Sequence, residues 1–138
     1  MTGRFEVLEH TADVGLRLTG DSAEEVFEAA AEGLAALQGA WFPGEGEDQA
    51  LEVVAADLPG LLAAWLDEVL YLLEARDAVL GGVAVAFVQD RRVAGTVRLA
   101  PRADRDLESV GVKAATLHRV RFERAPNETW SADVYLDV

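Results

Sequence analysis

The sequence predicts an α+β fold: a single domain over residues 1–138 in which a mixed, largely antiparallel β-sheet packs against two main helices in two layers. Strand-like alternation of apolar and polar residues recurs near both ends of the chain, and two longer stretches repeat apolar residues at helical spacing. A short turn joins the last two strand-like runs, which is typical of antiparallel neighbours. A chain of 138 residues fits one domain and can bury roughly two-thirds of the surface that its unfolded form exposes.

The N-terminus predicts two strands followed by a helix. Residues 4–9 and 14–19 alternate as half-buried strands do, and His10-Thr11-Ala12-Asp13 links them. Beyond them, Ser22 and Glu25 have the spacing of a capping box at a helix N-terminus. The apolar stripe of this helix consists of Val26, Phe27, Ala30, Leu34 and Leu37, and Gly39 ends it.

The middle of the chain predicts a loop, a short strand and the central helix. Residues 41–49 are rich in glycine and acids, which indicates a loop, and residues 51–55 form a short strand. Asp57 can cap the helix that follows, and Pro59 is tolerated in its first turn. Its unusually wide apolar face predicts a place in the core: Leu61, Leu62, Trp65, Leu66, Val69, Leu70 and Leu73.

The C-terminal part predicts two antiparallel strand pairs. After Gly81-Gly82, residues 83–88 and 93–99 form strands, with a hairpin turn at 89–92. Residues 101–109 have no apolar period and predict an exposed loop. The last two strands pair through residues 125–128. His118, Val120 and Phe122 share a face of the first; Trp130, Ala132, Val134 and Leu136 share a face of the second, with Asp133, Tyr135 and Asp137 opposite.

The formal charge of −13 lies almost entirely in the first half of the chain. Residues 1–75 hold sixteen acids and two arginines, whereas residues 76–138 hold nine acids and ten bases. Such a chain repels nucleic-acid phosphates and can instead approach a basic protein surface or cations. The absence of cysteine, of a signal-like N-terminus and of any apolar run near ~20 residues predicts a cytoplasmic protein without disulfides or membrane spans.

Lys113 is the one lysine among twelve basic residues, since the other eleven are arginines. An ammonium is a compact, rotatable charge, whereas a guanidinium is a broad planar fork. A lone lysine in such a chain indicates either a confined pocket or a phosphate-like partner, with chance as the alternative.

Three oxygen donors would suit a metal ion if the fold brings them together. Asp13 follows the first strand, Asp137 is the penultimate residue, and Val138 ends in a carboxylate. An all-oxygen cluster is typical of sites for Ca²⁺, Mg²⁺ or Mn²⁺. Clustered carboxylates repel one another, so either a metal or Lys113 should balance them. Taken singly, each aspartate is more typical of turn chemistry or of a solvated surface.

Four blocks in order resemble the archease family over essentially the whole chain: HTADVGL, AWLDEVLYLLE, VGVKAATLH and WSADVYLDV. The resemblance implies an accessory protein of RtcB-type tRNA-splicing RNA ligases that promotes guanylylation of the ligase and its multiple turnover, without itself being an enzyme. It implies metal ligands at Asp13, Asp137 and Val138, with calcium the usual metal and a transition metal as an alternative. It also implies a functional lysine at Lys113. Leu117 departs from the tyrosine that many relatives have at that position.

The resemblance further implies that tRNA is reached only through the ligase. His10 and His118 could surround the metal or act as bases, but a hydrogen-bonded structural role is the preferred interpretation. Two alternatives remain: a stand-alone metal-dependent hydrolase or phosphotransferase that uses Asp13 and Asp137, and a chaperone-like protein-binding module. Neither a cysteine or serine nucleophile motif nor a phosphate-cradling glycine loop is present to favour the first alternative.

Overall fold

The computed structural model describes residues 3–9, 13–103, 112 and 114–137, and at residues 9, 13, 114 and 116–119 the description is of the backbone. Two helices and seven strands follow one another in the order β1-β2-α1-β3-α2-β4-β5-β6-β7. Their bounds are β1 (Arg4–Glu9), β2 (Asp13–Gly20), α1 (Ala23–Leu37), β3 (Glu47–Val54), α2 (Leu58–Ala75), β4 (Ala78–Val88), β5 (Arg92–Pro101), β6 (Ala114–Arg124) and β7 (Trp130–Asp137).

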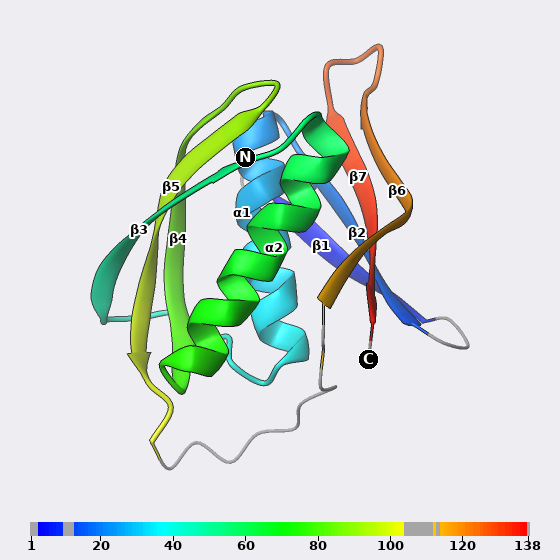
Figure 1. Cartoon of the computed structure of the whole chain (residues 1–138). Coiled ribbons are helices and arrows are strands. Elements are labelled where there is room, and N and C mark those ends of the chain that lie inside the picture. The colour runs from blue at the N-terminus through cyan, green and yellow to red at the C-terminus, as the bar shows by residue number, and fades with distance from the viewer. Residues whose placement is uncertain (1–2, 10–12, 104–111, 113, 138) are drawn as a thin grey trace.

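The strands form two sheets whose pairings are all antiparallel. One sheet has the order β1-β2-β7-β6 and the other the order β3-β5-β4. Figure 1 shows α1 and α2 between the two sheets, and each helix contacts strands of both. The predicted α+β class, with antiparallel strands against two helices, is confirmed. The prediction of one sheet is corrected to two, because the helix pair covers an apolar face on each side.

Helix α1 begins and ends as its sequence predicts. The Ser22 hydroxyl accepts a hydrogen bond from the Glu25 N–H (3.2 Å), and the Glu25 carboxylate accepts one from the Asp21 N–H (3.1 Å). This is a capping box displaced by one residue, since the glutamate usually reaches the N-cap amide itself. At the other end Gly39 has φ 63°, and the Ala40 N–H donates to the Ala35 carbonyl (2.7 Å). These features form a Schellman motif, in which a glycine takes the left-handed conformation at low cost.

Helix α2 is the centre of the core. The Asp57 carboxylate caps it by accepting from the Gly60 N–H (2.8 Å), as predicted. Trp65 is fully buried, and its indole N–H donates to the Phe27 carbonyl of α1 (3.0 Å). The Trp65 and Phe27 rings also meet edge to face at 6.1 Å between centroids. This buried aromatic contact, in which the indole N–H has a hydrogen-bond acceptor, holds the two helices together.

Several predicted boundaries of the three-stranded sheet are wrong. β3 begins at Glu47 within the predicted loop and ends at Val54, because its acidic first residues face solvent and hide the strand period. β4 begins at Ala78, so Gly81-Gly82 lies inside the strand, where the register with β5 shifts between Leu80 and Gly82. The hairpin turn is confirmed, although Arg92 already belongs to β5.

The four-stranded sheet has one apolar and one polar face, as predicted. Ala132, Val134 and Leu136 of β7 are fully buried against the helices, whereas Asp137 is exposed. The predicted loop at 101–109 lies mostly outside the described residues, and its first residue, Pro101, ends β5. Neither described helix is long and apolar enough to cross a membrane.

Candidate functional site

Asp13 and Asp137 lie directly opposite each other in the four-stranded sheet. They are Cα partners in the antiparallel pairing of β2 with β7. On its other side, Asp137 is the partner of Ala114, the first residue of β6. Cα atoms of directly opposed residues are about 4.5–5.5 Å apart in antiparallel sheets. Two of the predicted ligands are therefore brought together from opposite ends of the chain.

The remaining predicted site residues lie outside what the structure describes. These are Lys113, Val138 and His10, and the side chain of His118. Within the described part of the chain, no three His, Cys, Asp or Glu side chains form a group suited to a metal ion. The Asp13 side chain and the terminal carboxylate are not among those side chains, so the predicted ligand set stays a prediction.

The backbone on both sides of Lys113 is hydrogen-bonded to side chains from the two helices. The Val112 N–H donates to the Gln38 side-chain oxygen (2.9 Å), which lies at the C-cap of α1. The Ala115 N–H donates to the Asp67 carboxylate of α2 (2.7 Å). The roles of Gln38 and Asp67 could not be predicted from the sequence, because each bond joins residues far apart in the chain. The two contacts hold the backbone at Val112 and at Ala115 to the two helices.

Tyr135 lies two residues before Asp137 on β7, in the next row of the same face of the sheet. Its Cα partners are Gly15 on β2 and Thr116 on β6. A Cβ atom added at Gly15 would lie only 2.9 Å from Cε1 of Tyr135, so the tyrosine ring lies over the glycine. A larger residue at position 15 would therefore force the Tyr135 ring to shift. HTADVGL contains this glycine, but the sequence has no local signal for its contact with Tyr135.

A third row holds one carboxylate between two guanidinium groups. Asp133 is the Cα partner of both Arg17 and Arg121. Arg17 Nε lies 3.1 Å from one Asp133 oxygen, and Arg121 Nε lies 3.2 Å from the other. Burial opposes ionisation of Asp133, but the hydrogen bonds from the two arginines outweigh it and hold the pKa of this carboxyl below its usual value. The sequence predicts Asp133 on the polar face of its strand, but it has no local signal for this cluster.

β6 is irregular where the VKAATLH block ends. Thr116 pairs with Tyr135, and Arg121 pairs with Asp133. A step of five residues along β6 therefore corresponds to a step of two residues along β7. Such a bulge bends a strand and redirects its side chains, often beside functional sites. Val120 and Phe122 both pack against the core, as predicted. His118 lies within the irregular stretch, and its role stays a prediction.

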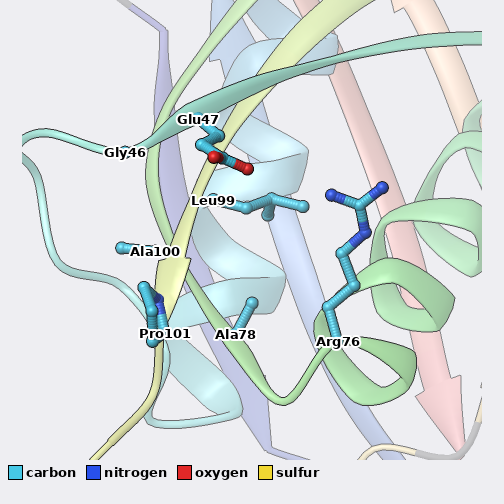
Figure 2. Close-up of a pocket in the computed structure, with 7 residues that line it drawn as sticks. All are labelled: Gly46, Glu47, Arg76, Ala78, Leu99, Ala100 and Pro101. Atoms are coloured by element: carbon cyan, nitrogen blue, oxygen red, sulfur yellow. The ribbon is translucent and has the colours of Figure 1, made fainter.

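A cavity lies on the other sheet. It has a volume of about 330 Å³ and lies at the start of β3. Figure 2 shows Glu47 and Arg76 near the side chain of Leu99. Its lining consists of Gly46, Glu47, Arg76, Ala78, Leu99, Ala100 and Pro101. None of these residues belongs to the strands that carry Asp13 or Asp137.

Comparison with known proteins gives one consistent result. The sequence pattern of the Archease protein family (MTH1598/TM1083) matches residues 5–138. The protein archease of Pyrococcus furiosus is 34% identical over 98% of this chain and 99% of its own length. The protein archease of Methanosarcina mazei is 28% identical over 98% of this chain and 96% of its own.

Solved structures agree with the sequence comparison. The solution structure of Methanobacterium thermoautotrophicum protein 1598 superposes with a TM-score of 0.74 and 26% identity, covering 97% of this chain and 98% of that one. A Thermotoga maritima archease, described as a possible chaperone, superposes with a TM-score of 0.63 and 21% identity, covering 95% and 94%. The second likeness concerns the fold alone.

Proposed function

Because the chain belongs to the archease family, we propose that it is a metal-binding accessory protein of an RtcB-type tRNA-splicing RNA ligase. In this role it promotes guanylylation of the ligase and so allows multiple turnover, without catalysing ligation itself. The observation that carries the proposal is the direct opposition of Asp13 and Asp137 across β2 and β7. These are the two positions at which the family resemblance implies metal ligands.

The donor set fits a hard divalent cation. Like charges that are directly opposed across two strands destabilise a sheet unless something balances them. Asp13, Asp137 and the terminal carboxylate of Val138 would hold the ion, with calcium first and magnesium or manganese as alternatives. Bound there, the ion would supply a concentrated positive charge that attracts phosphate oxygens.

Lys113 is proposed to supply a second positive charge. Ala114, the residue after it, is the cross-strand partner of Asp137. In our proposal the Lys113 ammonium offsets the carboxylates or contacts a phosphate of the nucleotide that the ligase uses. The hydrogen bonds from Val112 to Gln38 and from Ala115 to Asp67 support this role, because they position the backbone on both sides of the lysine.

The charge distribution supports docking on a protein and not directly on RNA. The acidic first half of the chain suits the basic, RNA-facing surface of a ligase, where electrostatic complementarity speeds association. The family resemblance implies that tRNA is contacted only through the ligase.

The decisive experiment is multiple-turnover RNA ligation by a cognate RtcB-type ligase, with and without this protein. We expect faster guanylylation of the ligase and repeated turnover only when the protein is present. Asp137→Asn is the loss-of-function variant, and Asp90→Asn, in the exposed β4–β5 turn, is the matched control. No effect on the ligase would contradict the proposal. Substrate turnover by the isolated protein would favour a hydrolase or phosphotransferase, and equal stimulation of unrelated proteins would favour a general chaperone.

A further inference from the structure

The two edge strands of the three-stranded sheet, β4 and β3, differ in whether other segments cover their outer edges. The outer edge of β4 is covered along its length by α1 and by the loop before β3. The N–H groups of Val85 and Val88 donate to the Glu28 and Glu24 carboxylates at 2.8 and 3.1 Å. At the start of β4, three backbone hydrogen bonds join it to the loop: Leu80 N–H to the Ala40 carbonyl, Phe42 N–H to the Leu80 carbonyl and Gly44 N–H to the Gly81 carbonyl.

The outer edge of β3 has no such cover among the described residues. The Ala55 N–H donates to the Arg91 carbonyl (3.1 Å), which shows that odd-numbered residues here direct their backbone groups toward β5. Backbone direction alternates along an antiparallel strand, so the even-numbered residues direct theirs away from the sheet. The only described hydrogen bond to these outward groups is from the Gln49 side chain to the Ala50 carbonyl. The outward residues are Asp48, Ala50, Glu52 and Val54, and all are exposed.

An uncovered edge of this kind is a template for another strand. Proteins usually protect such edges by bulges, charges or covering segments. β3 pairs with β5 without a register shift over its whole length, and Val54 at its end is 68% exposed. The geometry is therefore that of a regular strand with a free side, which is the requirement for β-strand addition by an extended peptide.

The charge of this edge selects the kind of strand that fits. Residues 43–57 contain five acids and no base: Glu45, Glu47, Asp48, Glu52 and Asp57. Arg98 and Arg92 of β5 lie 3.6 and 3.4 Å from Asp48 and Glu52 in exposed ion pairs, and Asp57 caps α2, whereas Glu45 and Glu47 have no described salt bridge. A second copy of the chain would bring two such acidic edges together. A basic strand is instead attracted.

We infer that the outer edge of β3 binds an extended segment of the ligase that carries lysine or arginine residues, as an added β-strand. The inference rests on the proposed function, because it takes the ligase as the partner. Main-chain hydrogen bonds to the outward groups of β3 supply affinity, and the acids supply charge selectivity. The edge belongs to a different sheet from Asp13 and Asp137, so docking leaves the row that carries the predicted metal ligands uncovered.

Amide hydrogen exchange on the full-length protein, alone and in complex with the cognate ligase, tests the inference. In the free protein, the outward amides of Asp48, Ala50, Glu52 and Val54 should exchange quickly, whereas those of Gln49, Leu51 and Val53 should already be protected. In the complex, the outward amides should become protected as well. If they still exchange freely in a saturated complex that activates the ligase, this inference is wrong and the proposed function stands. If no complex forms, both are wrong.

Ala50→Pro provides a matched functional test. Proline is tolerated on an edge strand where its N–H would face solvent, and it removes an outward donor while the pairing with β5 remains. We expect ligase binding to weaken at least about fivefold, while Ala50→Ser, which keeps the N–H, binds as the parent does. Reversing the charge of Glu45 and Glu47 to lysine should weaken binding as well. Parent-like binding by both the proline and the charge-reversed variants would overturn the inference.

Discussion

At the scale of single residues, the polar face of the four-stranded sheet is arranged in rows that cross β2, β7 and β6. Asp137 lies between Asp13 and Ala114, and Asp133 lies between Arg17 and Arg121. The Asp133 row is balanced by its own arginines, whereas the Asp137 row contains two acids, for which we propose a cation or Lys113 as the balancing charge. The Asp133 row therefore stabilises the sheet, whereas the Asp137 row is the one that we propose to bind metal.

Lys113→Arg should impair activation of the ligase although it preserves the charge. Arginine is larger, planar and differently hydrated, so it does not replace lysine in a confined position. We expect at least about tenfold slower guanylylation, and at least as large a loss for Lys113→Ala. The control is Arg124→Lys, at an exposed salt bridge with Glu128, which should have no effect. Unchanged activation by the arginine variant would show that only charge matters, provided that thermal unfolding shows all variants to be folded.

Extending the chain beyond Val138 should weaken metal binding. An added residue converts the terminal carboxylate into an amide, which removes one charged oxygen donor from the proposed set. Calcium titration of the native chain and of a chain with a short C-terminal extension measures the effect. Equal affinities would exclude the terminus as a ligand while leaving Asp13 and Asp137 open to direct test by substitution.

Asp133→Asn should destabilise the fold in a pH-dependent way. The pKa of Asp133 is below its usual value in the folded protein, so its stabilising effect is fully present above the unfolded pKa, about 3.9, and is lost as pH falls below that value. Urea unfolding at pH 7 should show a loss on the order of 1–2 kcal/mol, because Arg17 and Arg121 lose their shared partner. At pH 3 the difference should be smaller. A difference that does not change with pH would contradict this account.

At the scale of elements, α1 and α2 act on the site through their side chains as well as through the core. Gln38 at the end of α1 and Asp67 in the middle of α2 accept hydrogen bonds from the backbone on either side of Lys113. The helices are in turn fixed to each other by the buried contact of Trp65 with Phe27. The helix pair is thereby hydrogen-bonded to the backbone at the start of β6.

Asp67→Ala should lower ligase activation more than it lowers stability. The change removes an exposed acceptor, so the free energy of unfolding should fall by about 1 kcal/mol. Loss of the bond to the Ala115 N–H should also let the adjacent lysine move away from its working position. Asp67→Asn is the matched control, because its amide oxygen still accepts the bond. Guanylylation and urea unfolding of both variants make the comparison, and equal losses by both would point to charge as the contribution of Asp67.

At the scale of the whole molecule, the acidic half of the chain opposes nucleic acid, with a net charge of −14 over residues 1–75. Nonspecific RNA affinity arises from lysine and arginine neutralising phosphates. We therefore expect weak binding of tRNA by the isolated protein at physiological salt, measured by filter binding or fluorescence anisotropy. Tight, salt-sensitive binding would mean that the exposed arginines, such as Arg91 and Arg92, form an RNA surface after all.

The elements of this protein could be predicted from its sequence because their signals are local. Ser22, Asp57 and Gly39 mark helix ends through hydrogen bonds and backbone conformations that involve near neighbours. The alternation in residues 130–137 identified the buried and polar faces of β7 without knowledge of its partners. The family resemblance, in addition, directed attention to Asp13, Lys113 and Asp137, and two of these three prove to be cross-strand partners.

The pairing of strands and the contacts between distant side chains depend on the whole fold. The division into two sheets, the free edge of β3 and the covered edge of β4 depend on strand order, which local periodicity does not specify. The bond from Arg17 to Asp133 joins positions 116 residues apart, and that from Ala115 to Asp67 joins positions 48 apart. Such contacts follow from packing two apolar sheet faces against one helix pair. That packing is a property of the whole chain, because no single segment can bury its apolar face alone.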